Sequence, residues 1–566
     1  MHSLYLDLQV EPDLDHDQAR QRGARGHAVA ATASPLASLA AINVIKRGGS
    51  AADAVVAAQA VLGLVEPHAS GFGGGTVIVW HDQQTGEAGV IDGLAAAPAA
   101  VTDRLQVDFD GRTIPRERAM FGGRTVGVPG TLRALEKVHQ RFGRLPWHTL
   151  FDAAREHANV GFAMPPYLVK TITEIGSIQD EPLAQHIYCG GARRAVAEGT
   201  RIRNPEYAKT LAVIAEQGAD VFYQGIIAEN LIKVVTQDGF ASRMTLTDLK
   251  NYAAVERQPT RYHFNGMQVM TAPAPVFGGI SVGQIVGMIQ ALGLTGSDLT
   301  DNPELLHAVL EAGRLAFADR GAYIGDSSDA SINSALLDPA YLAQRAKNID
   351  FSRRANTARP GDLGVAHAAG PDGTGLTSAM TSHLVVSDLK GLTLSMTTTI
   401  NQNFGSRLST GGFYLNNVQT NFAAQPTAPH SEHRAYNAMA PGKRAMTSFA
   451  PSIMLDANGQ IKAALGAGGG NRIVGFVANA MLRIAAGYDD AQKIVSAPQA
   501  MNWNGLSNIE LGFAHARADL AEREHYVVMR RMDGGTQVAL KQGDRWSAGG
   551  DIRRDGTAIA LVRPNV

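Results

Sequence analysis

The stretch "GLTSAMTSHLVVSDLKGLTLSMTTTIN", residues 375–401, decides the fold of this chain. Two runs within it, "SHLVVSD" and "LTLSMTTTI", have the β-branched, alternating composition that is typical of strands. The segment from Asp388 to Gly391 predicts a two-residue hairpin turn between them. If Asp388 pairs with Gly391, the antiparallel register places Thr381 opposite Thr398, give or take one bulged residue.

The start of this hairpin allows two interpretations. Threonine and serine are favoured in strands, so the many hydroxyl groups could be ordinary scaffolding. Alternatively, cleavage of the Met380–Thr381 bond would leave Thr381 with both a hydroxyl and a free α-amine. An α-amine titrates near ~8 and can take the hydroxyl proton as a general base. The hairpin alone favours scaffolding, and the rest of the chain changes that balance.

The region before the hairpin predicts an α/β (α+β) protein. A helix beginning at Pro35 is expected to end at Gly48, and a second helix is expected to begin after Ser50 as its N-cap and to end at Pro67. Residues 150–350 have a largely helical pattern, in which "LHAVLEAGRLAFADRGAYIGD" is the clearest amphipathic run.

Two segments lack any such pattern. Residues 1–26 have the composition of a polar arm, and residues from about 352 to 380 are rich in Gly, Pro, Ala and Thr without periodicity. The second segment ends immediately before Thr381, at the sharpest change of composition in the chain. After that point the sequence predicts mainly strands.

Composition and charge exclude several classes of protein. The 566 residues carry 51 Lys and Arg against 52 Asp and Glu, a balance that does not favour nucleic-acid binding. The single cysteine, Cys189, cannot form an internal disulfide or a Cys-ligand zinc site, and we expect it to be an unreactive thiol. No apolar run approaches ~18 residues, so we expect no membrane span. The N-terminal residues do not resemble a secretory signal, so we expect a cytoplasmic protein.

Five segments resemble the gamma-glutamyltransferases and occur in the same order as in that family. They are "RGHAVAATASPLASLAAINVIKRGGSAADAVVAAQAVLGLVEPHASGFGGG", "GVPGTLRALEKVHQRFGRLPW", "TSHLVVSD", "NNVQTNF" and "KRAMTSFAPSIML…GAGGGNRI". The resemblance runs from about residue 27 to the end. It implies the four-layer αββα sandwich of the N-terminal-nucleophile hydrolases. It also implies a precursor that cuts itself before Thr381 into a heavy part, residues 27–380, and a light part, residues 381–566.

The resemblance implies a role for each matching residue. Thr381 matches the nucleophile of the family, and Thr399 matches the second threonine that holds its hydroxyl, in agreement with the hairpin register. Asn401 matches a residue that contacts the glutamyl head group. Gly469 and Gly470 match the oxyanion-hole pair of the family. Glycine suits this role, because backbone N–H groups can meet a developing oxyanion only where no side chain blocks the approach.

The chain departs from the family pattern where the substrate head group is bound. The family holds the α-carboxylate with an arginine in an Asp-x-Arg-x-x-Ala-Pro motif, but here the segment is "DGLAAAP" with Leu94 in that place. Asn421 occupies the position of an aspartate that holds the α-amine. Thr447 and Ser448 keep hydroxyls where the family has two serines. Charge-assisted contacts are worth roughly 1.5–3 kcal/mol each, so these changes weaken recognition of a zwitterionic head.

Three hypotheses follow. The first is a self-processed threonine amidase or acyltransferase whose acyl group lacks the α-amine, as in relatives that resemble cephalosporin (glutaryl) acylases or oxamate-type amide hydrolases. The second is a true gamma-glutamyltransferase in which Arg124, Arg407 or Arg472 replaces the missing arginine. The third is an unprocessed binding or scaffold protein.

The expected partners are few. We expect a small amide substrate, no cofactor and no metal, and a heterodimer of heavy and light parts that is able to pair further. The stretch His430–Arg434 falls where the family has an active-site lid and is expected to be a solvated loop rather than a metal site.

Overall fold

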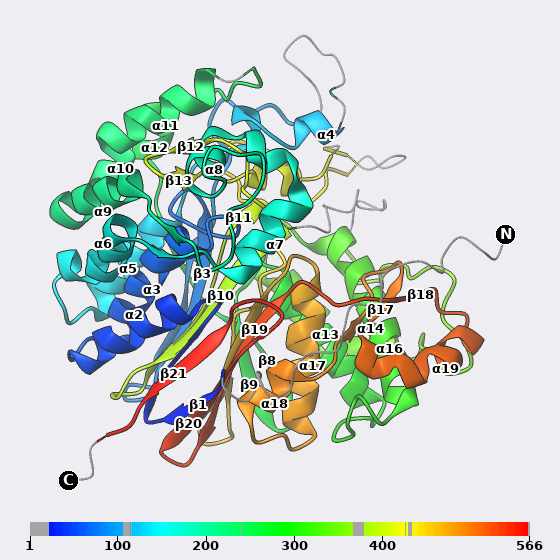
Figure 1. Ribbon diagram of the computed structural model, residues 1–566. Coiled ribbons are helices and arrows are strands. Elements are labelled where there is room, and N and C mark those ends of the chain that lie inside the picture. The colour runs from blue at the N-terminus through cyan, green and yellow to red at the C-terminus, as the bar shows by residue number, and fades with distance from the viewer. Residues whose placement is uncertain are drawn as a thin grey trace.

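Two antiparallel sheets of seven strands each form the centre of the protein and are covered by helices on their outer faces (Figure 1). The computed structural model describes residues 22–105, 114, 116–237, 239–365, 379–424, 426–427 and 433–563. The arrangement confirms the predicted four-layer sandwich. Most of the expected arm, residues 366–378 of the expected linker and residues 430–432 of the expected lid lie outside the described residues.

The first sheet contains the predicted hairpin at its centre. In spatial order its strands are β21 (Thr557–Leu561), β2 (Ala28–Thr32), β10 (Ala379–Ser387), β11 (Leu392–Gln402), β3 (Gly75–Asp82), β4 (Ala88–Gly93) and β7 (Val255–Arg257). The hairpin strands β10 and β11 are therefore flanked on both sides by strands from the N-terminal part of the chain.

The second sheet faces the first. In spatial order its strands are β1 (Ala24–Gly26), β20 (Arg545–Gly550), β19 (Gly535–Gln542), β15 (Ile461–Gly468), β14 (Ser452–Leu455), β9 (Met267–Thr271) and β8 (Thr260–Phe264). Strand β1 consists of the last three residues of the expected polar arm, which pair with β20.

The outer helices cover the two sheets separately. Helices α2 (Pro35–Lys46), α3 (Ala51–Val65) and α5 (Thr131–Phe142) pack on the first sheet, and α13 (Gly278–Ala291), α17 (Arg472–Ala485) and α18 (Ala491–Ser496) pack on the second. The remaining helices are α4 (Arg116–Ala119), α6 (Asp152–Val160), α7 (Pro166–Ile175), α8 (Pro182–Ile187), α9 (Pro205–Gln217), α10 (Asp220–Gln224), α11 (Ile226–Gln237), α12 (Leu246–Lys250), α14 (Pro303–Tyr323), α15 (Ala330–Leu336), α16 (Pro339–Ala346) and α19 (Arg517–Glu522). Short additional strands are β5 (Phe162–Ala163), β6 (Arg201–Ile202), β12 (Ser409–Thr410), β13 (Phe413–Tyr414), β16 (Ala500–Met501), β17 (Ser507–Ile509) and β18 (Val527–Met529).

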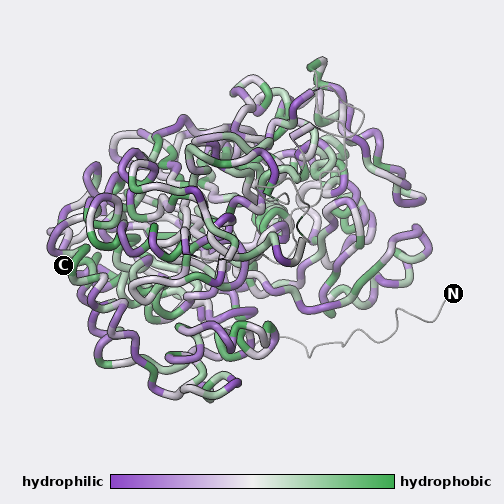
Figure 2. Tube along the Cα trace, turned by 90° about the horizontal axis from the view of Figure 1, so that it is seen from above, coloured by the Kyte–Doolittle hydropathy of each residue, from purple (hydrophilic) through white to green (hydrophobic). Residues whose placement is uncertain are grey.

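Strand alternation explains why the hairpin lies in the middle of four layers. Leu384 and Val386 belong to the core that the first sheet shares with α2 and α3, whereas Val385 belongs to the core between the sheets. Because both faces are buried, a polar residue on either face needs an internal partner. Seen from above, hydrophilic segments lie mostly toward the rim of the molecule (Figure 2).

The predicted helix boundaries at the N-terminal end are confirmed. Helix α2 begins at Pro35, and Gly48 follows its end with a φ of 92°. Helix α3 begins after Ser50, whose side chain accepts a hydrogen bond from the backbone N–H of Asp53, while the Asp53 carboxylate accepts the N–H of Ser50.

Residues 150–350 are largely helical, as predicted, but the expectation of an amphipathic helix within them is wrong. The segment predicted as amphipathic forms α14, but almost every residue of this helix is buried, including Asp319 and Arg320. In the sequence, charged residues on a buried helix look like a solvent-exposed face. The structure shows that they have internal partners, as Asp319 does in its ion pair with Arg345 at 3.0 Å. The same region also supplies β7, β8 and β9, which complete the edges of both sheets.

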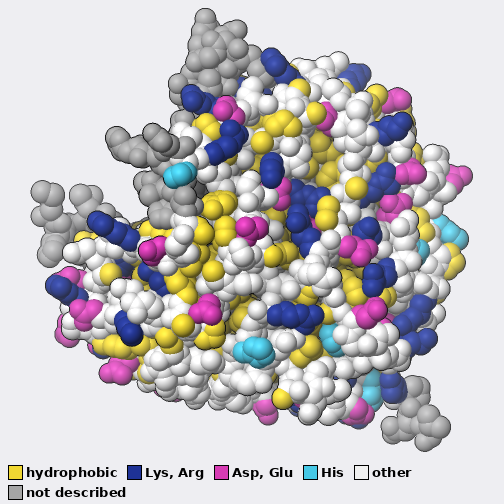
Figure 3. Space-filling model, turned by 180° about the vertical axis from the view of Figure 1, so that it is seen from behind, with side chains coloured by type: hydrophobic (Ala, Val, Ile, Leu, Met, Phe, Trp, Pro, Cys, Tyr) yellow, Lys and Arg dark blue, Asp and Glu magenta, His cyan; other side chains and the backbone are white. Residues whose placement is uncertain are grey.

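The face of the molecule seen in Figure 3 has no single dominant charge. On the face seen in Figure 3, Lys and Arg side chains lie among Asp and Glu side chains, in line with the net charge of −1. Within the described ranges, no helix has the length and apolar character needed to cross a membrane.

Candidate active site

The hairpin loop differs from its prediction by one residue. Ser387 pairs with Thr393, and the N–H of Asp388 donates to the carbonyl of Leu392, so the loop has three residues rather than two. Gly391 closes the loop with a φ of 98°, a left-handed conformation that favours glycine. The predicted two-residue turn is therefore wrong, and the pairing of the two strands moves by one position.

A β-bulge then places Thr381. Ser382 pairs with Thr398 and Met380 with Asn401, so Thr381 alone lies opposite two residues of β11, Thr399 and Ile400, and the extra residue belongs to β11. The bulge turns the Thr381 side chain toward Thr399, and the two hydroxyl oxygens lie 3.4 Å apart. Thr381 is only 2% exposed.

The Thr399 hydroxyl connects the predicted nucleophile with the bond that precedes it. It donates to the carbonyl oxygen of Met380 at 2.5 Å and accepts the backbone N–H of Asn401 at 2.8 Å. A hydroxyl has one proton to donate, and the Thr399 hydroxyl uses it in the hydrogen bond to the Met380 carbonyl. The Thr381 hydroxyl is consequently the donor toward Thr399, and its lone pairs are left for other contacts.

Asn401 is held in an unusual backbone conformation at the end of β11. Its φ is 79°, and its side-chain amide donates to the side chain and carbonyl of Asn417 and to the hydroxyl of Thr420, at 3.0–3.2 Å. These contacts fix the strand end that supplies an N–H to Thr399.

A buried arginine holds the other side of the nucleophile. Arg554 follows β20 in the chain, and its guanidinium donates to the Thr381 carbonyl at 2.7 Å and to the Met380 sulfur at 3.1 Å. It also lies over the ring of Tyr167, 5.3 Å from the centroid. The backbone of Thr381 is thus held by a charge as well as by strand pairing.

Glu66 reaches the same place from the end of α3. The Ser382 hydroxyl donates to the Glu66 carboxylate at 2.6 Å and accepts a hydrogen bond from Ser70 at 3.1 Å. Burial raises the pKa of Glu66 to about 7, although Arg554 and the Ser382 hydroxyl oppose the shift. Nearby, burial lowers the pKa of His68 to about 3, so this imidazole is neutral.

A small pocket brings together most of the residues predicted for the site. Seven of them line it, namely Thr381, Thr399, Asn401, Asn421, Thr447, Ser448 and Gly470. Asn421 is the last residue of a short 3-10 turn, Val418–Asn421. The carbonyl of Asn421 accepts a hydrogen bond from the Asn437 side chain at 2.8 Å. Ser448 donates to the carbonyl of Gly470 at 2.8 Å.

The two predicted oxyanion-hole glycines lie between β15 and the beginning of α17. Gly469 has a φ of 126° and Gly470 a φ of 63°, conformations that a side chain would strain. Neither backbone N–H donates a hydrogen bond to any of the described residues. Two unpaired N–H groups before a helix N-terminus form an arrangement that can stabilise an oxyanion.

Leu94 does not line this pocket. It is 5% exposed in the hydrophobic core, its N–H donates to Asp92 at 2.9 Å, and its carbonyl accepts the Tyr252 hydroxyl at 2.7 Å. Asp92 in turn pairs with Arg444 at 2.7 Å. The position that holds an arginine in the family motif is therefore a buried leucine here, and Arg444 is paired with Asp92.

The three arginines considered as replacements also lie outside the lining of this pocket. Arg124 lines a separate pocket with Gln419, and Arg407 stacks over Phe121 at 4.0 Å. Arg472 begins α17 and donates to the carbonyl of Asp533 at 3.4 Å.

Sequence reasoning missed two arginines that the fold brings to the site. Arg320 of α14 lines the same pocket as Thr381, and Arg554 contacts Thr381 directly. Arg320 stands in a run that resembles an ordinary helix, and Arg554 lies 173 residues after Thr381. Only the packing of distant parts of the chain brings Arg320 and Arg554 close to Thr381, so no local sequence motif indicates either residue.

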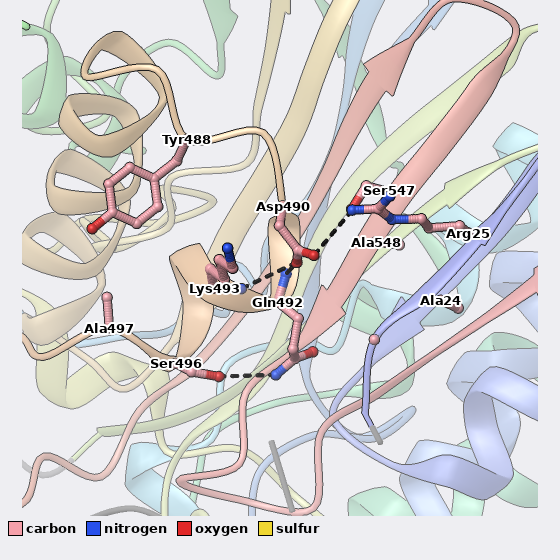
Figure 4. A pocket seen from close by; sticks show the side chains of 11 residues that line it. Ala24, Arg25, Tyr488, Asp490, Gln492, Lys493, Ser496, Ala497, Ser547 and Ala548 are labelled. Atoms are coloured by element: carbon pink, nitrogen blue, oxygen red, sulfur yellow. Dashed lines mark hydrogen bonds and ion pairs between the residues drawn. The ribbon is translucent and has the colours of Figure 1, made fainter. Parts of the chain in front are cut away.

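Other features of the described chain are less suited to chemistry. A wider pocket of about 700 Å³ lies between β1, β20 and α18, where Arg25 pairs with Asp490 and Gln492 donates to Ser496 (Figure 4). None of the residues predicted for the site lines it. Cys189 is buried, and burial raises the pKa of its thiol. Within the described ranges, no three His, Cys, Asp or Glu side chains converge to form a metal site.

Comparison with known proteins finds enzymes that are similar to this chain in sequence and fold. Residues 37–561 match the gamma-glutamyltranspeptidase family model. The chain is 31% identical over 555 residues to the acylase ACY 1 proenzyme of Pseudomonas sp. strain SE83, covering 95% of this chain and 94% of that one. It is 30% identical over 481 residues to the glutathione hydrolase proenzyme of Bacillus subtilis strain 168, covering 83% and 80%.

A solved structure shows the same fold. The cephalosporin acylase from Bacillus halodurans matches 99% of this chain and 100% of its own with a TM-score of 0.82 and 23% identity. Relatives named as an acylase and as a glutathione hydrolase are equally similar in sequence, so similarity alone does not choose between them.

Proposed function

Because the chain belongs to the gamma-glutamyltranspeptidase family of amide hydrolases and acyltransferases, we propose that it cuts itself before Thr381 and then cleaves amides through an acyl-enzyme on that residue. The observation that carries the proposal is the contact of the Thr399 hydroxyl with both Thr381 and the Met380 carbonyl.

The first step is an acyl shift within the chain. The Thr381 oxygen attacks the Met380 carbonyl carbon, the peptide C–N bond breaks, and the nitrogen gains the proton of the Thr381 hydroxyl and leaves as the α-amine of Thr381. Met380 is then held on the Thr381 oxygen as an ester, which water hydrolyses to a Met380 carboxylate and a free Thr381 hydroxyl. The Thr399 hydroxyl, which donates to the Met380 oxygen at 2.5 Å, polarises the carbonyl for this attack.

The second step uses the groups that cleavage releases. The α-amine takes the proton of the Thr381 hydroxyl as its oxygen attacks a substrate amide, and it gives that proton to the leaving amine. Gly469 and Gly470 supply N–H groups to the oxyanion. Thr399 loses its Met380 partner and is able to donate to the Thr381 oxygen. Water or an acceptor amine then releases the acyl group.

The acyl group is proposed to lack an α-amine. Asn421 lies in the pocket as a neutral amide where the family motif has a carboxylate, so an ammonium group has no counter-charge at that position. Gamma-glutamyl transfer remains the second candidate, because the Bacillus subtilis glutathione hydrolase is as similar as the acylase.

Two measurements test the proposal. A denaturing gel of the purified protein should show two bands that sum to the full chain, and the Thr381→Ala variant should show one band and no activity. A glutaryl anilide should be hydrolysed faster than a gamma-glutamyl anilide. An active protein that stays uncut would overturn the proposal, and a preference for the gamma-glutamyl anilide would establish the second candidate.

A further inference from the structure

One buried arginine contacts both residues that flank the bond proposed to be cut. The Nη1 atom of Arg554 donates to the carbonyl of Thr381 at 2.7 Å, and its Nη2 atom donates to the sulfur of Met380 at 3.1 Å. The two contacts use different nitrogens of one planar, rigid group. Arg554 is only 3% exposed, so water does not compete for these donors.

The guanidinium is not committed to a carboxylate. Among the described residues Arg554 has no ion-pair partner, and its Nε atom has no hydrogen-bond partner. The acids nearby are bound elsewhere, because Asp533 pairs with Lys170 at 2.8 Å and Glu66 accepts the Ser382 hydroxyl at 2.6 Å. A buried charge without an ion pair costs free energy. Its placement against the Met380–Thr381 bond therefore indicates a role at that bond.

The side chain of Met380 ends at hydrogen-bond donors. It packs against Ala69 and Tyr167, and its sulfur accepts the Tyr167 hydroxyl at 3.7 Å as well as the contact from Arg554 at 3.1 Å. A thioether sulfur is a weak acceptor. The residue before the cut is thus enclosed by apolar contacts along its length and by two donors at its tip.

Contacts on both sides of a peptide bond restrain its orientation. The Met380 carbonyl accepts the Thr399 hydroxyl at 2.5 Å, and the Thr381 hydroxyl lies 3.4 Å from the same Thr399 oxygen. Attack requires the Thr381 oxygen to approach the Met380 carbonyl carbon in one alignment, and a small displacement of reacting atoms slows such a step strongly. Arg554 restrains the chain on each side of that carbon without touching it.

We propose that Arg554 is a positioning residue for self-cleavage, and that it selects the residue before the cut by its need for a hydrogen-bond acceptor at the tip of that side chain. The inference rests on the self-cleavage proposed above and adds the group that orients the bond. It adds no covalent step, and the proton and leaving group move as in the acyl shift already described.

The test replaces Met380 with two side chains of similar size. Leucine has no acceptor, whereas glutamine has an amide oxygen that can accept from Arg554. Met380→Leu should slow cleavage by about 5–10-fold, the loss expected for one hydrogen bond. Met380→Gln should stay within about threefold of the wild-type rate. Apolar packing alone predicts the reverse order, because an unsatisfied buried amide costs more than leucine.

Substitution of Arg554 completes the test. Arg554→Met removes both donors and should slow cleavage by about 10–100-fold. In that background Met380→Leu should cause no further loss and Met380→Gln should lose its advantage, a coupling that a double-mutant cycle measures. In case Arg554→Met does not fold, the order of the two Met380 variants decides alone.

Met481 of α17 is the matched control. It is fully buried, and its sulfur also accepts a tyrosine hydroxyl, that of Tyr262 at 3.7 Å, but it belongs to a different part of the core. Met481→Leu should leave the cleavage rate unchanged. Equal slowing in Met481→Leu and Met380→Leu would mean a general effect of packing and would overturn the inference.

The remaining outcomes separate the two proposals. A Met380→Leu chain that is cut as fast as the wild type, or a Met380→Gln chain that is cut more slowly than Met380→Leu, would overturn the role of Arg554 and leave self-cleavage intact. A wild-type chain that is active but never cut would overturn the proposed function itself, and with it this inference.

Discussion

At the scale of single residues, Thr399 carries the most specific prediction. Replacing Thr399 with valine removes the hydroxyl that donates to the Met380 carbonyl but keeps the shape of the side chain. Removal of a single donor to a developing oxyanion costs on the order of 10²–10³ in rate. We therefore expect cleavage before Thr381 to slow by about that factor, measured as the rate at which the uncut band disappears after synthesis.

Thr398 provides the matched control for this experiment. It is the preceding residue, it is fully buried, and its hydroxyl has no hydrogen-bond partner among the described residues. Thr398→Val should leave the cleavage rate unchanged. Equal slowing in both variants would mean that Thr399 acts only through packing.

Glu66 predicts how stability depends on pH. Burial raises its pKa from 4.5 to about 7, so the folded protein keeps a proton that the unfolded chain loses between these values. Stability therefore falls as pH rises from about 4.5 to 7, because the unfolded chain releases this proton while the folded protein still holds it. A shift of this size is worth about 3 kcal/mol.

The Glu66→Gln substitution should remove this contribution. The comparison uses the uncut Thr381→Ala background, with and without Glu66→Gln. Between about pH 5 and pH 8, the free energy of unfolding of the chain that keeps Glu66 should fall relative to that of the Glu66→Gln chain by up to about 3 kcal/mol. Urea unfolding at the two pH values measures it. A difference that is independent of pH would contradict the raised pKa.

At the scale of elements, the hairpin loop that sets the register of β10 also makes a prediction. Gly391 has a φ of 98°, and a Cβ there would lie 3.0 Å from that of Gln83. In the same uncut background, Gly391→Ala should cost about 1–2 kcal/mol, the penalty for a left-handed residue. Gly505, which has open space around it and no positive φ, is the control and should tolerate alanine at little cost.

Cleavage should survive the Gly391→Ala substitution. Strands β2 and β3 pair with β10 and β11 from either side, so the register that places Thr381 does not depend on the loop alone. Loss of cleavage in a folded variant would show that the loop holds the nucleophile in place.

The same elements show how far sequence reasoning extends. The ends of α2 and α3 could be predicted because caps and glycines act locally. The hairpin was predictable, but its loop length was not, because "DLKG" fits either a two-residue or a three-residue connection. The burial of α14 depends on layers that pack from distant parts of the chain, so its charged residues resembled a solvent-exposed face.

The candidate site divides in the same way. Thr381, Thr399 and Gly470 stand in motifs that the sequence displays, and the fold places all three around one pocket. Arg320 and Arg554 reach the site only through the packing of α14 and of the segment after β20. Such residues belong to no local pattern, so their positions required the three-dimensional structure.

At the scale of the whole molecule, a cut before Thr381 would leave both sheets shared between two chains. In the first sheet, β2 lies between β21 and β10, so a strand from before the cut is enclosed by strands from after it. In the second sheet, β1, β8 and β9 form the edges around four strands that follow the cut. Neither part contains a complete sheet.

The two parts should therefore remain together. The cut protein should elute from a sizing column as one species under native conditions, and a denaturing gel of that peak should show both parts. The residue 27–380 part expressed alone should be insoluble, because its sheet strands lack partners. Separate elution of the two parts without denaturant would contradict the shared sheets.

The shared sheets also give such a protein a finite lifetime. One continuous chain joins its strands by closing loops, but two separate chains must find each other in solution before any core exists. The covalent link is thus needed to reach the native state and not to maintain it. Once a cut molecule unfolds, its pieces aggregate or are degraded faster than they reassemble, and its durability is governed by the height of the unfolding barrier rather than by an equilibrium.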